Sequence, residues 1–156
     1  MSIRDEDLTY DPRPDTVRMP YVYVAGPMTR PDFISTTRTA CELHLRLLED
    51  RVVIPFLPHL SVLQALVTPT PSTDLDFWLR HDFDVIDNAD AVLRMPGEST
   101  GADRETTYCE TGRSGLGEIP VFYMRHAGHL GALYDWADAW SARHPRTPAP
   151  HAEQPC

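Results

Sequence analysis

Short apolar segments alternate with helical patterns along the middle of this chain. Four segments have the length of buried strands: Tyr21 to Ala25, Val52 to Pro55, Ala89 to Arg94 and Ile119 to Met124. Apolar residues recur at helical spacing in Phe33 to Glu49 and again in Leu130 to Trp140. Strands that alternate with helices are typical of a parallel sheet covered by helices. The sequence therefore predicts an α/β fold, a single-domain flavodoxin-like or Rossmann-like parallel sheet flanked by helices.

The chain has 156 residues, a length that fits one domain. Residues 1–19 are charged, contain prolines and show no periodicity, so we expect an N-terminal arm. We expect the α/β domain over residues 20–143 and a disordered, proline-rich tail over residues 144–156. Within the domain, the segment Pro58 to Thr73 predicts a short helix followed by a mobile loop.

The formal net charge is -9, and all 14 basic residues are arginine. Nucleic-acid polymers and anionic membranes require a basic face, so neither is expected as a partner. A single nucleotide needs only a local cluster of donors and stays compatible with this charge. Because the chain has no lysine, Walker-type phosphate binding and Schiff-base chemistry are excluded.

The cysteines Cys41, Cys109 and Cys156 are far apart and odd in number, which fits a reducing cytoplasm better than a disulfide framework. Neither the cysteines nor the seven histidines have the spacing of metal ligands. We therefore expect no metal and no cofactor. No leader sequence and no long apolar run suggests secretion or a membrane span, so we expect a cytoplasmic protein.

Two carboxylates, Asp82 and Glu105, flank a predicted strand. Asp82 lies one helical turn before an apolar position, so its side chain can point along the buried side of its helix. Glu105 is expected on the first turn of the next helix, where the field of the helix amides favours an ionised carboxylate. An ordinary helix start, capped by Ser99 or Thr100 and followed by acidic residues, fits this second pattern equally well.

Two glycine-containing turns follow predicted strands and could hold a phosphate. The first, AGPMTRP, includes Gly26, at which a ligand can approach the backbone closely, with Met28 and Arg30 as further candidate contacts. The second includes Ser99 and Gly101, where helix amides can bind an anion. A plain Gly-Pro turn explains the first pattern as well as a binding loop does.

His59 and Tyr23 are further candidates near strand ends. A surface or capping role is the ordinary explanation for each histidine of this chain, but His59 follows the second predicted strand and is well placed to contact a base. Tyr23 alternates with valines along the first strand, and ordinary packing explains it unless its hydroxyl lies at the carboxyl edge of the sheet.

Three short motifs, taken in order, resemble the nucleoside 2-deoxyribosyltransferase-like superfamily. They are YVAGPMT, DxxxIDNAD and SxGADRE, and the resemblance covers Tyr21 to Met124. The superfamily includes transferases, 2'-deoxynucleoside 5'-monophosphate N-hydrolases and small uncharacterised phage and bacterial members. The chain departs from the family pattern at Cys109, where a small residue is usual, in the less basic loop after Gly26, and in the segment Pro58 to Thr73.

The resemblance implies a role for each matching residue. Glu105 would attack the anomeric carbon, Asp82 would bear on proton delivery to the leaving base, and Tyr23 would orient the glutamate. The hydrolase branch has a phosphate-binding serine six residues before its nucleophile, a position that Ser99 fills here, so a nucleotide is favoured over a nucleoside. Because sites in this family often lie at subunit interfaces, the resemblance also implies a homodimer or larger homo-oligomer.

These features together predict an enzyme that cleaves, or transfers from, the N-glycosidic bond of a nucleotide, with a (2'-deoxy)nucleoside 5'-monophosphate as the expected substrate. One alternative is a phosphoribohydrolase that acts on nucleoside monophosphates, because MPGESTGADRE loosely resembles the proline-glycine-glycine loop of such enzymes. That loop's glycine pair is not matched here. The other alternative is a non-catalytic nucleotide-binding or sensor module that shares the fold.

Overall fold

The computed structural model describes residues 17–29, 32–61, 75–112, 117–126 and 129–146. Most of the predicted arm and tail, Arg30 and most of Pro58 to Thr73 lie outside these ranges. Of the helix predicted in that last segment, residues 59–61 are described, and they are helical.

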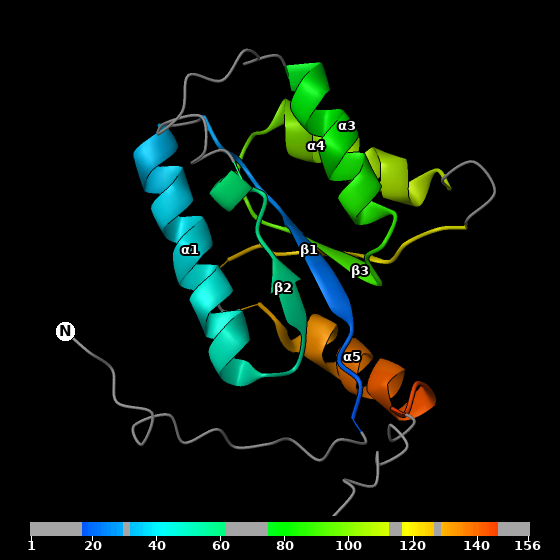
Figure 1. Cartoon of the computed structure of the whole chain (residues 1–156). Coiled ribbons are helices and arrows are strands. Elements are labelled where there is room, and N and C mark those ends of the chain that lie inside the picture. Colours follow the sequence, from blue (N-terminus) through cyan, green and yellow to red (C-terminus); the bar gives the residue numbers. More distant parts are fainter. Residues whose placement is uncertain (1–16, 30–31, 62–74, 113–116, 127–128, 147–156) are drawn as a thin grey trace, which may run out of the picture.

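The described part of the chain forms one α/β domain with a four-stranded, all-parallel sheet (Figure 1), as the sequence predicts. The strands are β1 (Tyr21–Ala25), β2 (Ile54–Phe56), β3 (Ala91–Arg94) and β4 (Val121–Tyr123). The helices are α1 (Phe33–Asp50), α3 (Leu75–Ile86), α4 (Thr100–Glu110) and α5 (Gly131–Arg143). The order β2-β1-β3-β4 matches the first four strands of a flavodoxin-like sheet.

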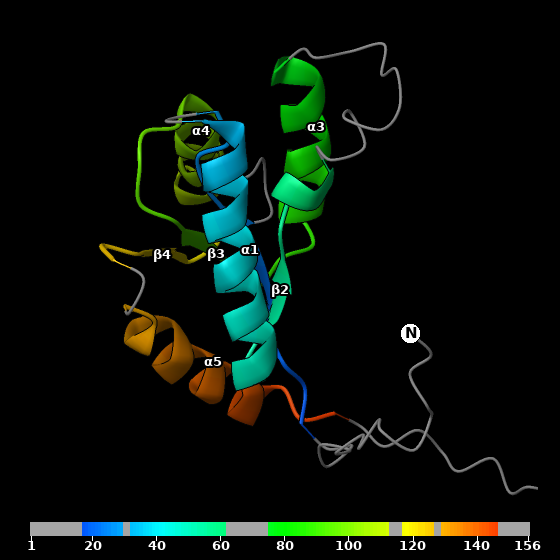
Figure 2. The same cartoon turned by 90° about the vertical axis from the view of Figure 1, so that its left-hand side faces the viewer.

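Two apolar clusters cover the two faces of the sheet, because side chains alternate along β1 and β3. Val22 and Val24 pack with buried residues of α1 and α5. Tyr23 and Ala25 pack with buried residues of α3 and α4, which lie beside each other. Figure 2 shows α1 in front of the strands and α5 below it. All four residues of β3 are buried, as expected for a strand in the middle of a parallel sheet.

Five strand boundaries, in β2, β3 and β4, differ from the prediction by one or two residues, and the local backbone explains two of the shifts. Before β3, Ala89 N donates to Ile86 O at 2.9 Å, so this residue ends the preceding turn instead of joining the strand. β4 starts after Pro120, whose nitrogen has no proton to donate to a neighbouring strand. β2 begins two residues later than predicted, after the turn that follows α1.

The strand order places a topological switch point between β1 and β3. From β1 the chain first adds β2 on one side and later returns to add β3 on the other. Open α/β sheets bind ligands beside the carboxyl ends of the strands at such a point. Here that edge holds Gly26, directly after β1, and Met95, directly after β3. The two lie so close that a β-carbon built at Gly26 would be 2.7 Å from Met95 Sδ.

None of the helices in the described ranges combines the length and apolar character needed to cross a membrane.

Leu47 and Leu48 provide a matched test of the core beneath α1. Leu47 is fully buried in the apolar cluster, whereas its neighbour Leu48 is 47 % exposed. We expect Leu47→Ala to lower the free energy of unfolding by about 2–5 kcal/mol, through lost burial and a residual cavity. Leu48→Ala should change it by about 0.5 kcal/mol or less. Urea denaturation of both variants checks this, and equal effects would contradict the described orientation of α1.

Candidate active site

Tyr23, Asp82 and Glu105 come from three different elements and meet between the sheet and the α3–α4 pair. Tyr23 Oη donates a hydrogen bond to Glu105 Oε1 at 2.9 Å. The carboxyl group of Asp82 interacts with both Tyr23 and Glu105. All three side chains are buried, with exposures of 0 % for Tyr23, 5 % for Asp82 and 4 % for Glu105. The structure therefore brings together the three residues predicted to be catalytic.

Helical spacing explains why both carboxylates point inward. On α3 the buried residues are Leu79, Asp82 and Ile86, so Asp82 occupies a position between two core residues. On α4 the buried residues are Ala102, Glu105, Thr106 and Cys109. Ionisable groups at core positions cost free energy unless they are paired or hydrogen-bonded. Two carboxyl groups on such positions, in mutual contact, are a feature of functional sites.

Burial raises the pKa of both carboxyl groups. The pKa of Glu105 rises to about 8, mainly through burial and also through the nearby charge of Asp82. The Tyr23 hydroxyl and the charge of Arg94 act in the opposite direction. Burial raises the pKa of Asp82 to about 6. Between these values the coupled pair holds one proton, so it contains one acid and one base near neutral pH.

The position of Glu105 on α4 corrects one expectation from the sequence. The helix starts at Thr100 and its first turn carries Asp103, so Glu105 lies beyond that turn. The field of a helix terminus decreases within about one turn. Burial therefore outweighs the helix field, and the pKa of Glu105 is raised where the sequence suggested a carboxylate kept ionised by the helix.

Ser99 and Gly101 stand at the amino end of α4, as predicted. Ser99 is the N-cap, and its side-chain oxygen accepts a hydrogen bond from Ala102 N at 3.2 Å. The ordinary helix-cap interpretation of this motif is thus confirmed, and it does not prevent the neighbouring amides from meeting an anion. Gly101 is half-buried, and a β-carbon at this position would lie 3.8 Å from Leu75 Cδ1.

His59 lies behind the Gly26 turn and supports it. Its Nε2 bonds to the carbonyl oxygen of Pro27 at 2.9 Å, and the side chain is fully buried. Burial lowers the pKa of His59, so the ring is neutral and donates from Nε2. Its Nδ1 has no hydrogen-bond partner among the described residues. The predicted contact between His59 and a base would require the surrounding side chains to move.

Met28 is half-buried beside the same turn, and its carbonyl oxygen accepts a hydrogen bond from Thr36 Oγ1 at 2.7 Å. This bond ties the AGPMT segment to the first turn of α1. The turn at the carboxyl end of β1, which includes Gly26 and Met28, is therefore supported by His59 and by the first turn of α1. The predicted contribution of Arg30 lies outside the described residues.

Arg94 lies near the site, and no role was predicted for it from the sequence. It ends β3 and is only 7 % exposed. Its Nη2 donates to Gly97 O at 2.9 Å and to Asp103 Oδ1 at 2.8 Å, and its Nη1 donates to Met95 O. The sequence did carry a signal, an arginine at the end of an otherwise apolar strand. Its partner Asp103 is exposed.

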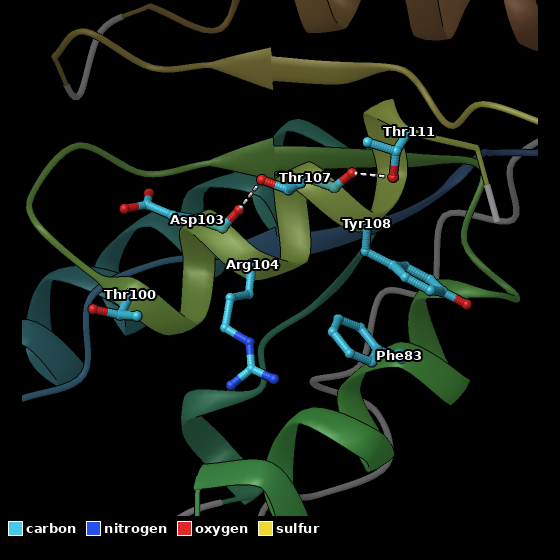
Figure 3. Close-up of a pocket in the computed structure, with 7 residues that line it drawn as sticks. All are labelled: Phe83, Thr100, Asp103, Arg104, Thr107, Tyr108 and Thr111. Atoms are coloured by element: carbon cyan, nitrogen blue, oxygen red, sulfur yellow. Dashed lines mark hydrogen bonds between the residues drawn. The ribbon is translucent and has the colours of Figure 1, made fainter.

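A pocket of about 430 Å³ lies beside α3 and α4, with Phe83 of α3 on one side and residues of α4 on the other (Figure 3). Its lining residues are Phe83, Thr100, Asp103, Arg104, Thr107, Tyr108 and Thr111. The rings of Phe83 and Tyr108 stack with centroids 4.3 Å apart. Glu105 is not among the residues that line this pocket, and it is buried on the side of α4 that faces the sheet. We therefore place the candidate active site at the buried contact of Tyr23, Asp82 and Glu105 and not in this pocket.

No group of three or more His, Cys, Asp or Glu side chains in the described ranges could hold a metal ion. Comparisons of the chain with protein-family models, with curated proteins and with solved structures find no match.

The raised pKa of Glu105 predicts how stability depends on pH. In the folded protein the pKa is about 8, compared with an ordinary value of 4.5, so the folded state binds this proton more tightly than the unfolded state. The stabilising contribution is complete below about pH 4.5 and is lost as the pH rises through 8. Glu105→Gln removes this titration.

Thermal unfolding at pH 5 and at pH 9 checks the expectation. The free energy of unfolding of Glu105→Gln, minus that of the wild type, should be larger at pH 9 than at pH 5. The increase should be on the order of a few kcal/mol. Glu110→Gln, an exposed position on the same helix, is the control and should show no such change. A pH-independent effect of Glu105→Gln would contradict the described burial.

Proposed function

We propose that this protein cleaves, or transfers from, the N-glycosidic bond of a nucleotide, with a (2'-deoxy)nucleoside 5'-monophosphate as substrate. The observation that carries the proposal is the buried contact of Tyr23, Asp82 and Glu105 beside the switch point of the sheet. Cleavage of a glycosidic bond needs one carboxylate and one carboxylic acid close together, and a pair that shares one proton supplies both. The resemblance to the nucleoside 2-deoxyribosyltransferase-like superfamily supports the same assignment.

In the proposed reaction the shared proton moves to Asp82, which leaves Glu105 as the anion. The Glu105 carboxylate attacks the anomeric carbon, and the bond from this carbon to the base nitrogen breaks. Asp82 gives its proton to the departing base. Water, or a second base, then attacks the anomeric carbon of the glycosyl ester, gives a proton to Asp82 and releases Glu105. The Tyr23 hydroxyl donates to the Glu105 anion and fixes its orientation.

The 5'-phosphate would bind at the turn after β3. Ser99 and Gly101 begin α4, whose free amides carry a partial positive charge. The turn at Gly26 is adjacent, because Gly26 packs against Met95 at the start of the same loop. A nucleotide with its phosphate at Ser99 could present its sugar to the carboxylates from the edge of the sheet.

One observation favours a second candidate, a non-catalytic nucleotide-binding module. Asp82 and Glu105 are almost completely covered, so a substrate reaches them only if neighbouring side chains move. A binding module with the same fold would need no such access. The two candidates differ in whether free base appears.

The test is to incubate the protein with a panel of nucleoside 5'-monophosphates and matching nucleosides, with and without an added acceptor base, and to follow free base by chromatography. We expect base release from monophosphates and its loss in Glu105→Gln. Asp82→Asn should lower the rate by about 10²–10⁴-fold, the range for loss of a general acid. Glu110→Gln is the control. No release under any condition, together with measurable nucleotide binding, would favour the binding module.

Tyr23→Phe tests the orienting role. The variant keeps the ring, which stacks on Phe56 with centroids 5.8 Å apart, and removes only the hydroxyl that donates to Glu105. Because this hydrogen bond lowers the pKa of Glu105, the acid limb of the kcat/KM profile should move to higher pH.

Tyr108→Phe is the matched control, since it removes a tyrosine hydroxyl bonded to Asp87 on the same side of the sheet. Its profile should coincide with that of the wild type. If the profile of Tyr23→Phe also coincides with it, Tyr23 has only a packing role.

A further inference from the structure

Arg94 is a buried cation on the same face of the sheet as Tyr23. In β3, Ala91 and Leu93 pack toward α1 and α5, and Val92 packs toward α3 and α4. The alternation of a strand places Arg94 on the side of Val92, beneath α4. Its side chain is 8 % exposed and is bonded to Asp103 on the first turn of that helix.

The ion pair with Asp103 does not explain why this arginine is buried. Asp103 is 67 % exposed, so a surface arginine could serve it equally well. The pair Arg104–Asp76 shows this alternative, with the same 2.8 Å distance and exposures of 47 % and 67 %. Burying one charge of such a pair is unfavourable, because the charge loses its hydration, unless other groups compensate. The carbonyl oxygens of Met95 and Gly97 supply part of that compensation, and a carboxylate in the same buried layer would supply more when it is ionised.

Glu105 lies in the same buried layer as Arg94. It is on the side of α4 that faces the sheet, and it accepts a hydrogen bond from Tyr23, which shares a face of the sheet with Arg94. The charged and titratable groups that act on Glu105 come from three elements: Tyr23 on β1, Asp82 on α3 and Arg94 on β3. Among them Arg94 is the only cation, and its charge lowers the pKa of Glu105. Asp82 is affected differently, because the charge that lowers its pKa belongs to His81. The guanidinium therefore acts selectively on one member of the carboxyl pair.

We propose that Arg94 is a positioning residue whose buried charge makes the anionic form of Glu105 accessible, while its hydrogen bonds hold the β3–α4 turn in register with that anion. The assignment of this anion as nucleophile rests on the proposed function. The hydrogen bonds join the strand end to Met95 O, Gly97 O and Asp103, so the turn and the charge are fixed by one side chain. This couples the proposed phosphate-binding turn to the reacting carboxylate.

Two substitutions separate the charge of Arg94 from its packing. Arg94→Lys keeps a cation at this position, and Arg94→Gln keeps a hydrogen-bonding group without the charge. Asp103→Asn breaks the same ion pair and leaves the guanidinium in place. All are made in the full chain, and circular dichroism establishes that each variant is folded.

The primary measurement is the titration of the Glu105 carboxyl carbon by NMR, with Glu105→Gln used to assign the signal. We expect a higher pKa for Glu105 in Arg94→Gln than in the wild type, and values close to wild type in Arg94→Lys and Asp103→Asn. Equal pKa values of Glu105 in Arg94→Gln and Arg94→Lys would overturn the proposal. If Arg94→Gln does not fold, a rise of the Glu105 pKa in Arg94→Lys as large as that in Tyr23→Phe would overturn it as well.

The titration needs no substrate, so its outcome is separate from that of the base-release assay. A raised pKa in Arg94→Gln, with no base release by the wild type, would support the charge role of Arg94 and reject the proposed function. Base release by the wild type would support the proposed function. If Arg94→Gln then has the same Glu105 titration and the same pH profile as the wild type, the charge role of Arg94 is rejected. If both hold, the acid limb of the kcat/KM profile in Arg94→Gln should move to higher pH, a change that loss of packing alone would not produce.

Discussion

The hydrogen bond from Tyr23 to Glu105 joins the centre of the sheet to the helix that covers it. It crosses from β1 to α4 at 2.9 Å and lies where neither group is reached by water. Without this donor, Glu105 would lose the hydrogen bond that favours its charged form, and the cost of its burial would rise. The packing of α4 on the sheet and the chemistry of its carboxylate therefore depend on the same contact.

Burial and neighbouring groups act in opposite directions on the pKa of Glu105 and together determine its charge state. Burial and Asp82 favour the neutral acid, and Tyr23 and Arg94 favour the anion. The neutral form is favoured in the free protein at pH 7, because the pKa of Glu105 is about 8. Such a balance leaves both forms within a modest free-energy difference, which suits a group that has to give up a proton before it can act as a nucleophile.

Much of the fold and part of the site could be predicted from the sequence. β1 was predicted with its observed bounds, because an unbroken apolar run lies between Pro20 and Gly26, both of which interrupt regular structure. The inward orientation of Asp82 followed from helical spacing. The contacts among Tyr23, Asp82 and Glu105 needed the resemblance to a known family, since no local pattern shows that residues 82 positions apart in the chain share a hydrogen bond.

Other features could not be predicted because they depend on burial in three dimensions. Arg94 lies in a strand buried on both faces, so the usual alternation of polar and apolar residues gives no sign of its direction. The effect of the helix amides on Glu105 depends on the residue at which α4 begins. A change of one or two residues in that start moves a side chain out of the first turn. His59 follows a strand as predicted, but its side chain is fully buried and bonds to the carbonyl oxygen of Pro27.

The cap at Ser99 has a consequence for any anion that binds at the start of α4. The Ser99 hydroxyl already accepts a hydrogen bond from Ala102 N, so this amide is occupied before a ligand arrives. A phosphate placed there would exchange one acceptor for another at that amide and would gain new bonds only at the amides beside it. The helix start is thus held in its final shape without ligand, and a ligand need not supply the free energy to order it.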